Sequence, residues 1–256
     1  MGAEYPVPKL PASPHQRLDH LATSVSIAIA GVLFAEIVAL DRLNIQLGYL
    51  RVVQNPPTDG FPITGPYGFW ANSTPLERAW PYPVLAVAFT LAAAVWLVWQ
   101  YQAHENRRAL RLSDDRFTPL AGVGSWFVPL ANLVLPALAI GELWGTPHGD
   151  TLGIQDRPRH RGNPVLWIWW TGILVSATLA GIAYVSAAIG GHSIEALARR
   201  NILLMWALVV SIVSGVLAAV MVHRISWRVL IKQDQVRFPP RWTAWGTPSE
   251  RSGVDS

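Results

Sequence analysis

The sequence has 256 residues, of which 51% are apolar and only 14% are charged, and its formal net charge at neutral pH is +4. This length suits one medium-sized domain, and the apolar residues gather in long uncharged runs rather than in the periodic stripes of a soluble globular protein. The chain contains no cysteine, which excludes disulfides, thiolate metal sites, iron–sulfur clusters and cysteine nucleophiles, and the small net charge does not indicate nucleic-acid binding.

Four apolar runs are long enough to cross a bilayer, whose hydrocarbon core requires about 20 helical residues. They are residues 21–40, 83–101, 165–189 and 202–222, and Glu36 in the first run is their one ionisable residue. Backbone groups in lipid must be hydrogen-bonded within the segment, so each run is predicted to be a helix. The first run is too long for the core of a signal peptide and is predicted to be a retained anchor. The sequence therefore predicts an all-α, polytopic membrane helix bundle with four transmembrane helices.

The remaining segments are polar or rich in proline. Residues 1–20 are predicted to be a flexible cytoplasmic N-terminus, residues 41–82 an outside loop, and residues 238–256 a disordered cytoplasmic tail. The membrane domain is predicted to occupy residues 21–237. Aromatic side chains favour the membrane–water interface. Eight aromatic residues at the ends of the spans are predicted to lie there: Trp80, Tyr82, Trp99, Tyr101, Trp167, Trp169, Trp170 and Trp227.

A fifth apolar stretch, residues 117–144, contains Pro119, Pro129 and Pro136. Prolines at this density break a helix into short pieces. With four spans, fifteen Lys and Arg residues lie on the cytoplasmic side and five outside, whereas a fifth crossing would give eight and twelve. The positive-inside rule therefore favours four spans with both termini in the cytoplasm. Residues 117–144 are predicted to be a re-entrant or interfacial segment on the cytoplasmic side, packed against the four spans.

Small residues recur at every fourth position in three of the spans, which allows helix backbones to approach closely in lipid. We interpret these stripes as packing within the bundle, with a homodimer interface as the alternative. The stripes are Gly31, Ala35 and Ala39; Gly172, Ser176 and Ala180; and Ser211, Gly215 and Ala219.

Glu36 is the first candidate for a functional residue, because a carboxylate inside hydrocarbon is costly. The alternative is that Glu36 has only a structural role, because it lies about one turn from the predicted outer end of its helix. From there the side chain would reach outward to the interface or pair with Arg42.

Other chemistry is hard to find in the sequence. His20, His104 and His223 lie at the ends of spans, without the spacing of a metal site on one helix. No phosphate-binding loop, nucleophile elbow or paired-carboxylate motif is present, and Gly-Val-Gly at 122–124 is interpreted as a flexible turn. We therefore predict no catalytic, cofactor-binding or metal-binding residues.

Polar residues near the broken stretch form the second candidate. Arginines that follow the second and fourth spans are expected to attract anionic lipid headgroups. We predict that Glu142 or Asn132 pairs with Arg107 or Arg108 and pins the stretch beneath the bundle. The complete predicted polar or interaction site is Glu36, Asn106, Arg107, Arg108, Trp126, Asn132 and Glu142.

A distinctive series of motifs runs from residue 98 to residue 237. The series comprises Asn-Arg-Arg-Ala-Leu at 106–110, Phe-Thr-Pro at 117–119, Trp-Phe-Val-Pro-Leu-Ala-Asn-Leu at 126–133, Pro136, Glu-Leu-Trp at 142–144, tryptophans at 167, 169 and 170, and Gln233-Asp234 with Arg237. In these motifs the chain resembles a family of actinobacterial integral membrane proteins, domain of unknown function 4328. The resemblance implies a multi-span membrane domain and no known activity.

Two classes of function remain open. Small size and the lack of a catalytic motif favour a non-enzymatic scaffold, sensor or accessory subunit, without a cofactor, in the cytoplasmic membrane of a bacterium. The alternative is a carrier or enzyme that handles a small molecule or a lipid. A polar cavity joining Glu36, Asn132 and Glu142 would favour the alternative, whereas a dry bundle would favour the first class. The expected partners are the lipid bilayer with its anionic headgroups and a protein partner or second copy, and not nucleic acid.

Overall fold

The computed structural model describes residues 18–56, 74, 80–109, 116–145, 164–190 and 193–231, and the helical backbone continues to residue 237. Every regular element in these residues is a helix. The expectations for residues 1–17 and 238–256 lie outside the described part. The elements in chain order are α1 (Leu18–Gln54), α4 (Pro81–Ala109), α5 (Pro119–Gly124), the 3₁₀ helix η1 (Ala131–Leu133), α6 (Leu135–Trp144), α7 (Pro164–Gly190) and α8 (Ile194–Arg237).

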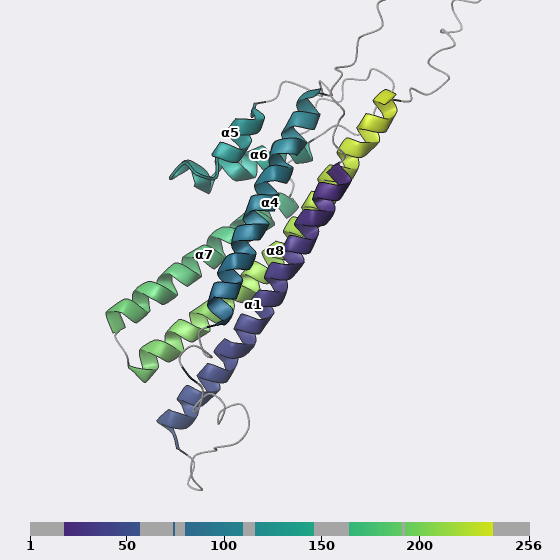
Figure 1. Cartoon of the computed structure of the whole chain (residues 1–256). Coiled ribbons are helices and arrows are strands. Elements are labelled where there is room, and N and C mark those ends of the chain that lie inside the picture. The colour runs from purple at the N-terminus through teal and green to yellow at the C-terminus, as the bar shows by residue number, and fades with distance from the viewer. Residues whose placement is uncertain are drawn as a thin grey trace, which may run out of the picture.

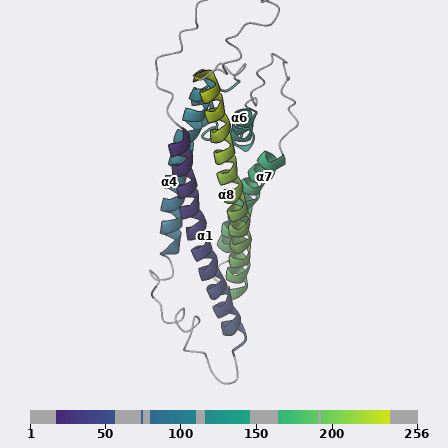
Figure 2. The same ribbon diagram turned by 90° about the vertical axis from the view of Figure 1, so that its right-hand side faces the viewer.

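Four of the helices, α1, α4, α7 and α8, are long and apolar enough to cross a membrane. The prediction of an all-α bundle with four such helices is therefore confirmed. The two longest, α1 and α8, lie side by side and antiparallel, with α4 and α7 flanking the pair (Figure 1, Figure 2). The start of α1 and the ends of α4 and α8 lie at the same end of the bundle, together with α5 and α6 (Figure 1). We call this end the basic end, because Arg107, Arg108, Arg116, Arg224 and Arg228 lie there.

The helices extend beyond the apolar runs, and this corrects the expected loop at 41–82. Helix α1 begins at Leu18 and continues to Gln54, so residues 41–54 are helical. Its 37 residues span about 55 Å, well beyond the thickness of a hydrocarbon core. The polar residues after Leu40 end the apolar run without ending the helix, because Leu43, Leu47 and Leu50 continue a buried stripe at helical spacing.

The proline-rich stretch is broken into short pieces, as its sequence predicts. The Thr118 hydroxyl caps α5 by accepting a 3.1 Å hydrogen bond from the main-chain N–H of Ala121, and Pro119 occupies the first turn. The chain then turns at Leu130, whose φ of 64° is the one positive value among the described non-glycine residues. We call residues 116–145 the platform. It packs against α4, α7 and α8.

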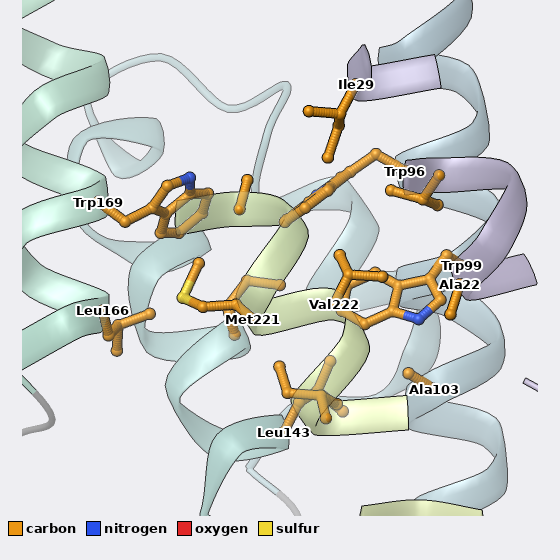
Figure 3. Close-up of a cluster of buried hydrophobic side chains, with 14 of the residues drawn as sticks. Ala22, Ile29, Trp96, Trp99, Ala103, Leu143, Leu166, Trp169, Met221 and Val222 are labelled. Carbon is orange, nitrogen blue, oxygen red and sulfur yellow. The ribbon is translucent and has the colours of Figure 1, made fainter. Parts of the chain in front are cut away.

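The core of the bundle lies at the basic end and is rich in tryptophan. Side chains from α1, α4, α6, α7 and α8 meet there, around Met221 and Val222 of α8 (Figure 3). Trp99, Trp169 and Trp170, which were predicted to mark the membrane interface, face the interior of the bundle, where all three are at most 3% exposed. Trp80, Tyr101, Trp167 and Trp227 do face outward.

The buried tryptophans contribute contact area and directed hydrogen bonds. Their rings pack against one another, with the Trp96 and Trp169 centroids 5.7 Å apart and stacked. The Trp99 indole donates to the Ser226 hydroxyl over 2.9 Å, and the Trp170 indole donates to the main-chain carbonyl of Leu133 over 2.8 Å. Because lipid is as apolar as these side chains, close packing and hydrogen bonds rather than the hydrophobic effect hold such helices together.

Two of the small-residue stripes form helix contacts inside the bundle. A Cβ on Gly172 would lie 2.2 Å from the Ser214 hydroxyl oxygen, and one on Gly215 would lie 2.9 Å from Leu33. Helices α7 and α8 therefore approach closely at residue 172, where an added Cβ would require the Ser214 hydroxyl to move. Gly31 is different, since a Cβ there would meet no atom of the described residues within 4 Å.

Candidate functional site

The seven residues of the predicted site lie in two separate places. Six belong to the platform or to the adjoining end of α4, whereas Glu36 lies in the middle of α1. The cavity that Glu36 lines includes neither Asn132 nor Glu142 in its wall. The structure therefore divides the predicted site into a platform junction at the basic end and a groove in the opposite half of the bundle.

Two arginines hold the C-terminal end of α6 at the platform junction. The Arg107 guanidinium on α4 donates to the main-chain carbonyl of Glu142. The Arg228 guanidinium on α8 donates to the main-chain carbonyl of Trp144 over 2.7 Å and lies 4.8 Å from the centre of the Trp144 ring. The last carbonyls of a helix lack partners within the helix and carry partial negative charge, so cations stabilise this end. We call this arrangement the arginine clamp.

The remaining polar residues of the prediction surround the clamp. The main-chain N–H of Arg116 donates to Glu142 Oε2 over 3.2 Å, which ties the start of the platform to its end. Asn106 is buried, Asn132 is half-buried in η1, and Arg108 is exposed. The platform is thus joined to α4 through Arg107 and Glu142, one of the four pairings that the sequence left open, and the hydrogen bond uses the main-chain carbonyl of Glu142.

Trp126 belongs to a second network, which joins α5 to α4. The Trp126 indole donates to Gln100 Oε1 over 2.8 Å, and the Gln100 amide donates to the main-chain carbonyl of Gly122 over 3.0 Å. A Cβ on Gly122 would lie 2.8 Å from His104 Nε2, so α5 meets α4 in close contact. The flexible turn expected at residues 122–124 is instead the end of the short helix α5, with Gly122 buried.

Glu36 lies far from the outer end of its helix, contrary to expectation. It is 18 residues from Leu18 and 18 from Gln54, and its side chain is 1% exposed. The Ser211 hydroxyl on α8 donates to Glu36 Oε1, while Glu36 Oε2 has no hydrogen-bond partner among the described residues. The interpretation that Glu36 reaches outward to the interface is therefore wrong.

A cavity of about 240 Å³ lies beside Glu36, and we call it the groove. Helices α4 and α7 form its two walls, and α1 and α8 lie between them (Figure 2). Tyr82 and Phe89 come from α4, and Ala180 and Tyr184 come from α7. Most of the residues that line the groove are apolar, and Glu36 is the one carboxyl group among them.

Sequence reasoning missed several residues that complete these two places. Gln100 is a polar residue within an uncharged run, and its presence there was a signal that it has a buried partner. Arg228 was interpreted with the other basic residues as attracting headgroups, because its position over Trp144 depends on tertiary structure. Ser211 was assigned to a small-residue stripe, although a hydroxyl at that position also supplies a hydrogen-bond donor. Within the described residues, no three His, Asp or Glu side chains gather as metal ligands would.

Comparison with known proteins gives a family and no activity. No curated protein and no solved structure matches the chain. The model of the family described as "Domain of unknown function (DUF4328)" matches residues 79–227, which include α4, the platform, α7 and most of α8. The match covers more than half of the chain and contains Arg107 and the platform, but it ends one residue before Arg228 and does not include α1 with Glu36. The chain therefore belongs to the DUF4328 family.

Proposed function

We propose that this protein is a non-enzymatic membrane protein, a scaffold or accessory subunit, that presents the platform to a partner protein at the membrane surface. One observation carries the proposal. Arg107 and Arg228 at the platform junction hold α6 to α4 and α8, through the arginine clamp, and neither lines the groove. Arginines that hold a segment in this way fix the position of its exposed surface, here the surface of the platform.

The surface that they position is apolar. Five large apolar side chains of the platform are 50% or more exposed: Leu120, Phe127, Val128, Leu130 and Leu133. Several exposed large apolar side chains on one short, held segment favour a protein or membrane contact. The clamp fixes the segment in advance, which lowers the entropy lost on binding.

We further propose that the basic end faces the cytoplasm of a bacterial cell, as the distribution of Lys and Arg along the whole sequence supports. Exposed arginines at this end, including Arg108 and Arg224, would then lie close to anionic headgroups. The platform would lie at the level of the headgroups, as an interfacial segment. The motif resemblance supports an actinobacterial source.

Site-specific photocrosslinking in native membranes tests the proposal. A photoreactive amino acid is placed at Phe127 or Leu130, which are 70% and 83% exposed, and at Phe34 of α1, which is 70% exposed on a transmembrane face. We expect a discrete protein adduct from the two platform variants and lipid adducts alone from the Phe34 control. Lipid adducts alone from all three variants would contradict a partner protein and would make the exposed side chains of the platform a membrane contact.

A second candidate function is supported by the groove. A cavity beside a buried carboxyl group favours a protein that handles a small molecule or a lipid. This function would use the other half of the bundle, so the two candidates do not exclude each other.

A further inference from the structure

We propose that the groove binds a lipophilic amine, meaning a small molecule with an apolar body and one amino group. The inference rests on the second candidate function and names its class of ligand. In this assignment, the amino group hydrogen-bonds to Glu36 and the apolar body lies between α4 and α7.

The hydrogen bonds inside the groove leave an acceptor to be satisfied. The Ser211 hydroxyl already donates to Glu36 Oε1, and the Ser176 hydroxyl donates to the main-chain carbonyl of Ala207 over 2.9 Å. Glu36 Oε2 remains without a donor among the described residues, although the side chain is almost completely buried. A buried carboxyl oxygen without a partner is costly, so a ligand that supplies an N–H is favoured over one that supplies only acceptors.

The aromatic side chains in the groove suit an ammonium group. Tyr82 on α4 and Tyr184 on α7 line the groove. Tyr82 interacts electrostatically with Arg200 of α8, which does not line the groove, and more weakly with Tyr184. Both tyrosines, and Phe89 beside them, are more than a third exposed. Aromatic faces attract ammonium groups, whereas they offer nothing to a carboxylate or phosphate.

The size and polarity of the groove limit the rest of the ligand. The groove's volume of about 240 Å³ exceeds the ~150 Å³ of an engineered apolar cavity that binds benzene. The lining apart from Glu36, the two serines and the tyrosines is made of Ala, Leu and Phe side chains. A sugar or nucleotide would leave its polar groups unpaired there, whereas an alkyl or aryl body would not.

Photolabelling of the full-length protein, reconstituted in phosphatidylcholine vesicles, tests this assignment. Two probes are used, a decylamine that carries a diazirine on its chain and a decanol with the same diazirine. Labelled peptides are located by mass spectrometry. In the unaltered protein we expect both probes to reach α4 and α7, with the amine labelling the groove about tenfold more strongly, as a hydrogen bond to a charged group implies.

Two variants and one control complete the test. Glu36→Gln keeps the acceptor for Ser211 and removes the acid, and we expect it to lower amine labelling to the level of the alcohol. Ala180→Leu fills the groove without altering Glu36, and we expect it to abolish labelling by both probes even if Glu36→Gln does not fold. Ala188→Leu, on the exposed part of α7 outside the groove, should label like the unaltered protein.

The outcomes separate the inference from the function on which it rests. Equal labelling of the groove by amine and alcohol would overturn the amine assignment and leave a small-molecule or lipid site. Labelling that Ala180→Leu does not change, or labelling outside the groove alone, would overturn both.

Discussion

Arg228 on α8 contacts Trp144 on α6 in two ways at once. Its guanidinium donates a 2.7 Å hydrogen bond to the main-chain carbonyl of Trp144, and its central carbon lies 4.8 Å from the centre of the indole ring. A planar guanidinium can do both, whereas a lysine ammonium is a compact charge without a face to stack. The end of the platform is therefore fixed to the fourth long helix by one side chain, 84 residues away in the sequence.

The clamp should be measurable in the stability of the purified protein. Arg228→Ala leaves a helix-terminal carbonyl without its charged donor, and we expect a loss of about 1.5–3 kcal/mol in the free energy of unfolding. Arg228→Lys should recover part of this loss. Arg224→Ala removes a neighbouring exposed charge on the same helix and should change little. Denaturant unfolding in detergent, followed by tryptophan fluorescence, measures all three. Equal stability of Arg228→Ala and Arg224→Ala would contradict the clamp.

The contact between α5 and α4 should depend on the absence of a side chain at residue 122. Gly122→Ala places a Cβ within 3 Å of the His104 ring, so we expect a loss of about 1–3 kcal/mol. Gly124 lies two residues later in the same helix, and a Cβ there meets nothing within 4 Å among the described residues. Gly124→Ala should therefore leave the melting temperature unchanged or slightly raised. A Gly122→Ala variant as stable as Gly124→Ala would show that α5 does not pack in this way.

The close approach of α7 and α8 can be tested by a rescue. Gly172→Ala puts a Cβ 2.2 Å from the Ser214 hydroxyl oxygen and should destabilise the bundle by about 1–3 kcal/mol. Removing that oxygen with Ser214→Ala in the same chain should restore most of the loss, because the next contact, with Cβ of residue 214, is an ordinary 3.5 Å. Gly181→Ala, where a Cβ meets no described atom within 4 Å, is the control. Additive losses in the double variant would disprove the contact.

The hydrogen bond between Trp99 and Ser226 links α4 to α8 inside the core. Trp99→Phe, Ser226→Ala and the double variant form a thermodynamic cycle, and we expect a coupling of about 0.5–1.5 kcal/mol. Thermal unfolding in detergent micelles measures it. A coupling near zero would mean that packing alone holds the Trp99 ring.

Much of the fold follows from hydropathy, and what does not follow has physical reasons. Length and the absence of charge identify the four long helices, because a bilayer requires both. The end of α1 could not be found by hydropathy, which falls after Leu40, although the spacing of Leu43, Leu47 and Leu50 carries the helical signal. Proline positions predict the broken platform because each removes a backbone donor.

The candidate site was only partly predictable, because the sequence shows conspicuous residues but not the tertiary contacts that they make. Trp99 and Trp169 stand at the ends of apolar runs, as interfacial tryptophans do. Only the rotation of their helices turns these two side chains into the core. Glu36 is conspicuous in the sequence, but its partner Ser211 lies 175 residues away and its groove is assembled from four helices. The pairing of Arg107 with Glu142 was one of four that the sequence left open, whereas the contribution of Arg228 depends on the path of α8.

The measurement that tests this account most directly is the side of the membrane on which each end of the bundle lies. Because the chain has no cysteine, single cysteines can be introduced at four exposed residues: Glu105 and Arg116 at the basic end, and Asn55 and Ser193 at the opposite end. A membrane-impermeant maleimide should label the Asn55 and Ser193 variants in intact cells, and the Glu105 and Arg116 variants only after permeabilisation. Labelling of Arg116 and Ser193 from the same side would contradict the four-span arrangement and the cytoplasmic platform together.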